Sequence, residues 1–120
     1  MLLLLPGFLF SMEHPVNVKL VKKQGNNYTL KVSVPDGFGI QREAPNRLLV
    51  SGEGIKVTKA DLKFKGPVNS KKNEYFLAVD EMPLVLEGKG ILQIQARIYY
   101  CDYSKNICIN GKMQFKEKVD

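Results

Sequence analysis

The feature that most constrains this chain is an alternation of apolar and polar residues that recurs in several short runs. In the run 28–34, Tyr, Leu and Val residues alternate with Thr, Lys and Ser. In the longer run 91–101, apolar residues at the even positions alternate with Gln and Arg. A period of two is typical of β-strands that bury one face, and few segments show a helical period. The sequence therefore predicts an all-β fold.

Turn signals separate these runs at intervals of about 8–12 residues, which is typical of sandwiches and barrels. We expect about seven to nine short strands in an immunoglobulin-like β-sandwich, with a small barrel as the alternative. A chain of 120 residues suits a single domain, which we place at 12–120. Among the predicted segments are short strands at 48–50, 55–59 and 75–79, turns at 52–54 and 88–90, and a final strand at 109–119.

The first ten residues are apolar, and Ser11 ends the run. We interpret 1–11 as the remnant of a signal peptide, although no Lys or Arg precedes its apolar part. A first strand with an apolar lead-in and a membrane-proximal remnant are the alternatives. No stretch of the chain reaches the roughly 18 apolar residues of a membrane-spanning helix. Export would place the protein in the periplasm or cell envelope, where disulfides persist.

The formal net charge is +6, and only three of the basic residues are arginines: Arg42, Arg47 and Arg97. The lysines are scattered along the chain. Proteins that read nucleic acids favour clustered Arg beside stacking aromatics, and the sequence shows no such cluster. We therefore expect no nucleic-acid partner. The charge is interpreted as a solubilising surface that also protects strand edges, with attraction to acidic partners or an anionic membrane surface as a weaker alternative.

Residues for hydrolytic or metal chemistry are sparse. The single histidine, His14, lies near the start of the predicted domain. Two cysteines and one remote histidine do not make a zinc site, which takes four close ligands. Gly52-Glu53-Gly54 is not followed by the Lys-Ser/Thr of a phosphate-binding loop. The sequence predicts no metal site and no cofactor.

The only two cysteines, Cys101 and Cys108, stand at the head of the last predicted hairpin, so they either pair with each other or stay free. Cys101 is in phase with the Gln and Arg residues of 91–101, and Cys108 with the polar residues of 109–119. Successive side chains of a strand point to opposite faces, so both sulfurs are expected on the wetter face. The pair suits a disulfide that is reachable from outside.

Two functions are open for such a pair. In thiol–disulfide exchange, a partner thiolate attacks one sulfur and expels the other. The alternative is a β-sandwich binding or structural module whose disulfide is only a staple, worth roughly 2–3 kcal/mol for so short a loop. An immunoglobulin staple usually crosses the core beside a Trp, and this chain has no Trp. Tyr99 and Tyr103 flank the pair and either shield it, form a docking surface or simply pack in the hairpin.

At these residues the chain resembles a known family. Tyr99-Tyr100-Cys101-Asp102, followed by Cys108 and an alternating last strand, is similar to the N-terminal immunoglobulin-like periplasmic domain of the thiol–disulfide interchange family DsbD. It also resembles the C-terminal β-domain of thioredoxin/NHL-repeat proteins. Two other segments support the likeness, which covers about 16–119: the stretch 35–42 is similar to a family Gly-Tyr-Tyr-Leu-Tyr-Arg segment, and Phe64-Lys65-Gly66 with Glu74-Tyr75-Phe76 to a cap loop and the following strand.

The resemblance implies an electron carrier that exchanges with a thioredoxin-fold protein. Cys101 and Cys108 would be the redox pair, with Cys108 the attacked sulfur and Phe64 the cap. The chain departs from the family in its spacing of six residues rather than five, in Leu62-Lys63 where an acidic pair is expected, and in Gly39 and Gln41 in place of aromatics. We expect a monomer whose redox partner is a separate chain. Together with Phe64, we expect three further aromatic residues to form the cap or docking surface: Phe38, Tyr99 and Tyr103.

Overall fold

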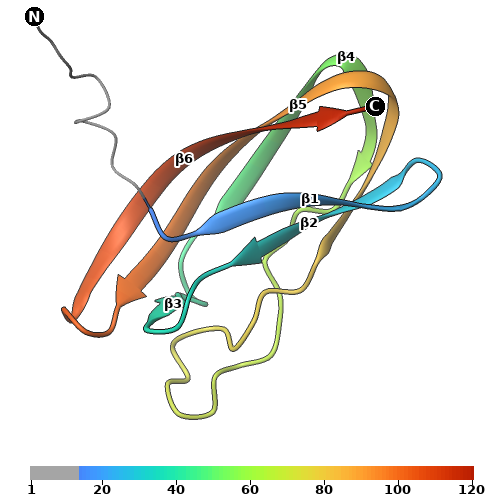
Figure 1. Cartoon of the computed structure of the whole chain (residues 1–120). Coiled ribbons are helices and arrows are strands. Elements are labelled where there is room, and N and C mark those ends of the chain that lie inside the picture. The colour runs from blue at the N-terminus through green and yellow to red at the C-terminus, as the bar shows by residue number, and fades with distance from the viewer. Residues whose placement is uncertain (1–13) are drawn as a thin grey trace, which may run out of the picture.

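A computed structural model describes residues 14–120, and in that range it shows a single antiparallel sheet (Figure 1). The all-β prediction is thereby confirmed. The proposed signal-peptide remnant at 1–11 lies outside the described residues. Within 14–120 there is no helix of the length and apolarity that crossing a membrane requires. The six strands are β1 (Asn17–Gln24), β2 (Asn27–Ser33), β3 (Phe38–Ile40), β4 (Arg47–Ala60), β5 (Met82–Asp102) and β6 (Ile107–Val119).

The long strand β5 organises the sheet. Its first part pairs with β2, its second part pairs with β6, and β4 runs beside both parts. The short strand β3 pairs with the last residues of β5, from Tyr100 to Asp102. The hairpin of β1 and β2 follows the predicted alternation, with Val18 opposite Val32 and Leu20 opposite Leu30.

The prediction of seven to nine strands is wrong for the described residues, because two glycine-containing segments bend strands instead of ending them. β4 continues through 52–54, and β5 continues through 88–90. Gly90 has a φ of 155°, and a Cβ there would lie 1.9 Å from the carbonyl oxygen of Glu53. Only glycine permits the two backbones to approach so closely, so both long strands bend together at this place.

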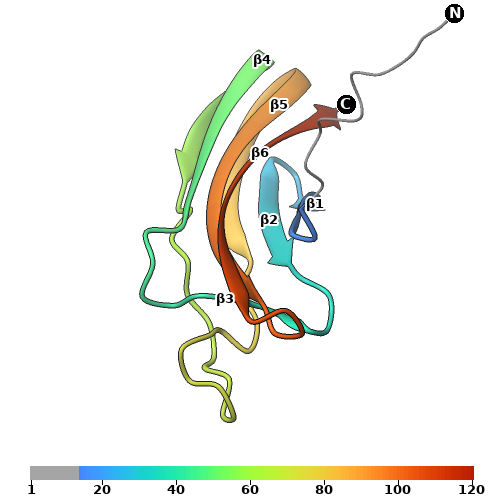
Figure 2. The same ribbon diagram turned by 90° about the vertical axis from the view of Figure 1, so that its left-hand side faces the viewer.

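The bends let the sheet curve over itself. Figure 2 shows β4, β5 and β6 arching on one side, with β1 and β2 on the other. Apolar residues of both parts form one core cluster, in which Leu30, Leu92 and Ile98 have no exposed surface. This arrangement leaves the opposite face of β4, β5 and β6 turned to the outside, and we call it the outer face.

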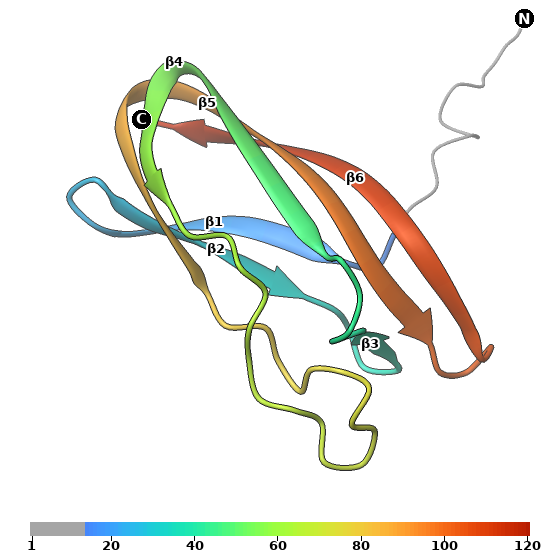
Figure 3. The same cartoon turned by 180° about the vertical axis from the view of Figure 1, so that it is seen from behind.

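The segment 61–81 is a long connection rather than a strand (Figure 3). The strand predicted at 75–79 is wrong: only two isolated bridges form, Gln41 with Tyr75 and Val68 with Phe76. The neighbouring sheet edge is β3, which is three residues long, so the ladder has no room to extend. The N–H of Phe76 still donates to the carbonyl of Ile40, and this bond seats the connection beside β3.

Candidate functional site: a half-covered disulfide

The two cysteines are direct cross-strand partners at the end of the β5–β6 hairpin. They form a disulfide, and their Cα atoms are 3.9 Å apart. The register confirms the prediction that both side chains leave the same face of the sheet. That face is the outer one, which also carries Tyr99 and Arg97 of β5 and Lys112 of β6.

The two cysteine residues differ in exposure. Cys108 is exposed, whereas Cys101 is only 3% exposed. Cys101 is in phase with Arg97 and Tyr99 along β5, so its side chain leaves the outer face and is covered there. The prediction of a disulfide that is reachable from outside therefore fits the exposed Cys108, whereas Cys101 is buried. A disulfide between one exposed and one buried cysteine residue is more open to a reagent on the side of the exposed residue, Cys108.

The cover is explained by Gly39, the β3 residue opposite Cys101. A Cβ on Gly39 would lie 2.0 Å from the hydroxyl oxygen of Tyr103 and 2.9 Å from a ring carbon of Tyr75. Cross-strand partners point to the same face, so both tyrosines lie on the side to which Cys101 points. The absence of a side chain on Gly39 is what makes room for them.

The two tyrosines form a joint cover. Their ring centroids are 5.2 Å apart with an interplanar angle of 66°, and the Lys72 ammonium lies 4.8 Å from the centroid of the Tyr103 ring. The Tyr103 N–H donates to the Gly37 carbonyl at 2.9 Å, which ties the end of the hairpin to β3. Burial, followed by the nearby Tyr75 and Glu74, raises the pKa of Tyr103. The hydroxyl therefore stays protonated at neutral pH.

The turn beside the disulfide is closed by Asp102. Its carboxylate accepts bonds from the Ser104 hydroxyl at 2.7 Å, the Ser104 N–H at 3.0 Å and the Lys105 N–H at 3.3 Å. The Ser104 side-chain bond is the main reason that the pKa of Asp102 is lowered. Asn106 takes a positive φ of 53°, as turns of this kind often require of Asn. Asp102 is thus used to shape the turn that holds Cys108 opposite Cys101.

Of the predicted cap or docking residues, the structure brings Tyr103 to the disulfide. Tyr99 shares the outer face, half-buried, and its N–H donates to the Asn46 side chain at 2.7 Å. Phe64 and Phe38 pack against the core cluster instead, and the Phe38 ring lies 6.2 Å from that of Tyr100. Phe38 lies opposite Asp102 and so leaves the face of the sheet opposite to that of Cys101.

Sequence reasoning missed two residues that matter here, Tyr75 and Gly39. Tyr75 stood inside the segment Glu74-Tyr75-Phe76 that carried part of the family resemblance, so a weak signal was present. In the sequence Gly39 is conspicuous only because it stands where the resembled family has an aromatic residue. Nothing in the local sequence shows that Gly39 lies opposite Cys101, because the two belong to strands far apart in the chain.

On the core side, Tyr100 lies next to the disulfide in sequence. The Nδ1 atom of His14 is 2.6 Å from the Tyr100 hydroxyl oxygen, and the two rings meet edge to face at 5.7 Å. Burial, and then the charge of Asp102, raises the pKa of Tyr100. Among residues 14–120, no three His, Cys, Asp or Glu side chains gather into a group that suits a metal ion.

The raised pKa of Tyr100 predicts a loss of stability in alkali. The native state holds the phenolic proton more tightly than the unfolded chain, so stability is full below the ordinary tyrosine pKa of about 10. It falls as the pH rises through the higher native value. We expect Tyr100→Phe to reduce this alkaline loss when urea unfolding is compared at pH 8 and pH 11. An unchanged loss would show that Tyr100 does not carry it.

The fold and the site define a class: an all-β domain with one antiparallel sheet and a cross-strand disulfide on its outer face. No model of a known protein family matches the sequence, and no curated protein matches it either.

Proposed function

We propose that this protein is an exported thiol–disulfide exchange domain that uses the Cys101–Cys108 pair as an electron carrier. The proposal includes an immunoglobulin-like sandwich, as in the DsbD N-terminal domain, and a partner of thioredoxin fold on a separate chain. The observation that carries it is the unequal exposure of the two cysteine residues: Cys101 is 3% exposed, whereas Cys108 is an exposed residue. A disulfide that only stabilises a hairpin does not require one exposed and one buried cysteine.

In the proposed reaction a partner thiolate attacks Sγ of Cys108. The attack forms a mixed disulfide and breaks the Cys101–Cys108 bond, whose electron pair passes to Sγ of Cys101. That sulfur then takes a proton from solvent. A second thiolate of the partner attacks its own sulfur in the mixed disulfide and releases Cys108, which is also protonated. Two electrons have moved: the domain holds two thiols and the partner holds the disulfide.

The geometry favours Cys108 as the attacked sulfur. Exchange requires the nucleophile to approach in line with the bond that breaks, from the side opposite the leaving sulfur. Cys108 lies on β6, and within residues 14–120 this strand pairs only with β5, so no other described strand stands beside Cys108 on that side. The reverse approach, to Cys101, is closed by Tyr103, Tyr75 and β3.

The test is a comparison of two single-cysteine variants. The probe is a thioredoxin with one active-site cysteine, activated as a mixed disulfide with a chromogenic thiol. We expect Cys101→Ser, which keeps Cys108, to form the protein–protein disulfide at least about tenfold faster than Cys108→Ser, because access controls the rate.

The reduction potential of the wild-type pair completes the test. A value above about −300 mV supports a carrier. A value well below that, together with no trapping by either variant and a loss of stability on reduction, would identify the disulfide as a staple in a structural or binding module. Equal trapping by both variants would contradict the assignment of Cys108.

A further inference from the structure

Three cations meet on the outer face although they are far apart in sequence. Arg47 of β4 lies opposite Arg97 of β5, and Arg97 lies opposite Lys112 of β6. Cross-strand partners project from the same face, so the three side chains form one transverse line, which we call the basic row. Two of the only three arginines in the chain belong to it.

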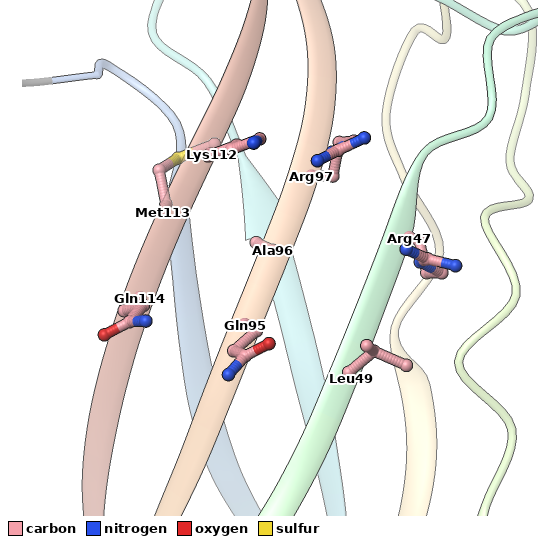
Figure 4. Close-up of a pocket in the computed structure, with 8 residues that line it drawn as sticks. All are labelled: Arg47, Leu49, Gln95, Ala96, Arg97, Lys112, Met113 and Gln114. Atoms are coloured by element: carbon pink, nitrogen blue, oxygen red, sulfur yellow. The ribbon is translucent and has the colours of Figure 1, made fainter.

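The basic row borders a shallow hollow of about 490 Å³ (Figure 4). The next line of residues across the same three strands is Leu49, Gln95 and Gln114. All three are exposed, and Leu49 is 51% exposed. The hollow thus combines cationic donors, amide groups and one apolar side chain.

The charge of the basic row is uncompensated within 14–120. The ion pairs of the described residues are Lys23 with Glu81 and Lys118 with Asp120, and neither includes a member of the row. The acidic residue Glu53 of β4 is too far along the sheet to neutralise the row, because it faces Ile91, six residues before Arg97 on β5. Its carboxylate accepts a hydrogen bond from the Gln93 side chain. Like charges directly opposite each other destabilise a sheet. The fold therefore holds together cations that repel one another.

We propose that the basic row is a docking site for an acidic segment of a protein partner. The planar guanidinium groups of Arg47 and Arg97 suit bidentate pairing with carboxylates. Gln95 and Gln114 offer amides to the backbone of such a segment, and Leu49 offers an apolar contact. With strands about 4.8 Å apart, the row is about 10 Å wide and matches two or three carboxylates rather than a long track of phosphates.

The position of the basic row is compatible with the disulfide chemistry but does not depend on it. Arg97 precedes Cys101 by four residues on the same face of β5, a separation of about 14 Å along the strand. If an acidic segment of a partner binds at the row, the part of the partner next to that segment can reach Cys108. Peptide binding to the row can be measured while the disulfide is intact. The docking proposal can therefore fail while the exchange proposal stands, and the exchange proposal can fail while the docking proposal stands.

The test uses an acetylated hexaglutamate peptide, titrated into the full chain and followed by NMR chemical shifts. We expect shifts centred on the basic row and an affinity that falls at least about tenfold in the double variant Arg47→Gln/Arg97→Gln. The matched control is Lys19→Gln/Lys31→Gln, an exposed facing pair on β1 and β2 that removes the same charge. It is expected to change the affinity by about twofold or less.

Three outcomes would overturn the proposal. An equal loss in both double variants would show that net charge alone attracts the peptide. Equal binding of hexaglutamine would exclude recognition of carboxylates. Tighter row-dependent binding of a single-stranded oligonucleotide or of phosphatidylglycerol vesicles would make the site one for phosphates.

Discussion

Replacing Gly39 by alanine should make the Cys101–Cys108 disulfide react at least about tenfold faster with a small thiol such as dithiothreitol, because access limits the rate. The new Cβ would lie 2.0 Å from the Tyr103 hydroxyl oxygen and 2.8 Å from the adjacent ring carbon. That contact is with the far end of a flexible side chain, so Tyr103 moves rather than the backbone. The cover over Cys101 then opens at a cost of about 1 kcal/mol in stability.

Tyr103→Ala provides the independent route to the same state. It removes the cover directly, and the double variant with Gly39→Ala should react no faster than either single variant, since both act on one group. Tyr103→Phe keeps the ring over the site and should stay near the wild-type rate. If Gly39→Ala reacts at the wild-type rate while Tyr103→Ala reacts faster, the predicted displacement of Tyr103 is wrong.

The largest loss of stability is expected for Gly90→Ala. A Cβ on Gly90 would meet the Glu53 carbonyl oxygen at 1.9 Å and the Glu53 carbonyl carbon at 3.0 Å. Both atoms are backbone of the facing strand, and the φ of 155° is itself unfavourable for a side chain. Clash and strain together should lower the free energy of unfolding by about 2–5 kcal/mol in urea titrations.

Gly25→Ala is the control that separates the backbone strain of a positive φ from the steric clash of the new Cβ. Gly25 has a φ of 62° in the turn between β1 and β2, and a Cβ there would meet nothing within 4 Å. We expect a loss of only about 1–2 kcal/mol, the cost of the left-handed conformation alone. Equal losses in the two variants would mean that the close approach of β4 and β5 at Gly90 is not a constraint on the fold.

Prediction from the sequence succeeded where the signal is local. The alternation in 28–34 and 91–101 leads directly to β2 and to the second part of β5. Prediction failed where a local signal has two structural meanings. Gly88-Lys89-Gly90 is equally suited to a turn between strands and to a bend within one, and the presence of β4 beside it decides for the bend. Likewise 75–79 alternates as a strand does, but finds only the short edge of β3.

The candidate site divides in the same way. The alternation of 91–101 and 109–119 places both cysteines on one face, because side-chain direction along a strand depends only on parity. Their unequal exposure does not follow from parity. It follows from the pairing of β3 with the end of β5 and from the seating of Tyr75 by the connection 61–81.

The basic row shows the limit most clearly. Along the chain Arg47, Arg97 and Lys112 are isolated charges, and their sequence indicated no cluster. Local periodicity places Arg97 and Lys112 on the polar faces of their predicted strands, while Arg47 falls just outside the predicted strand at 48–50. The sequence alone is enough for the all-β class and for the common face of Cys101 and Cys108. The register between distant strands comes from packing of the whole core, and only that long-range packing decides that the cations meet in one line and that a glycine faces Cys101.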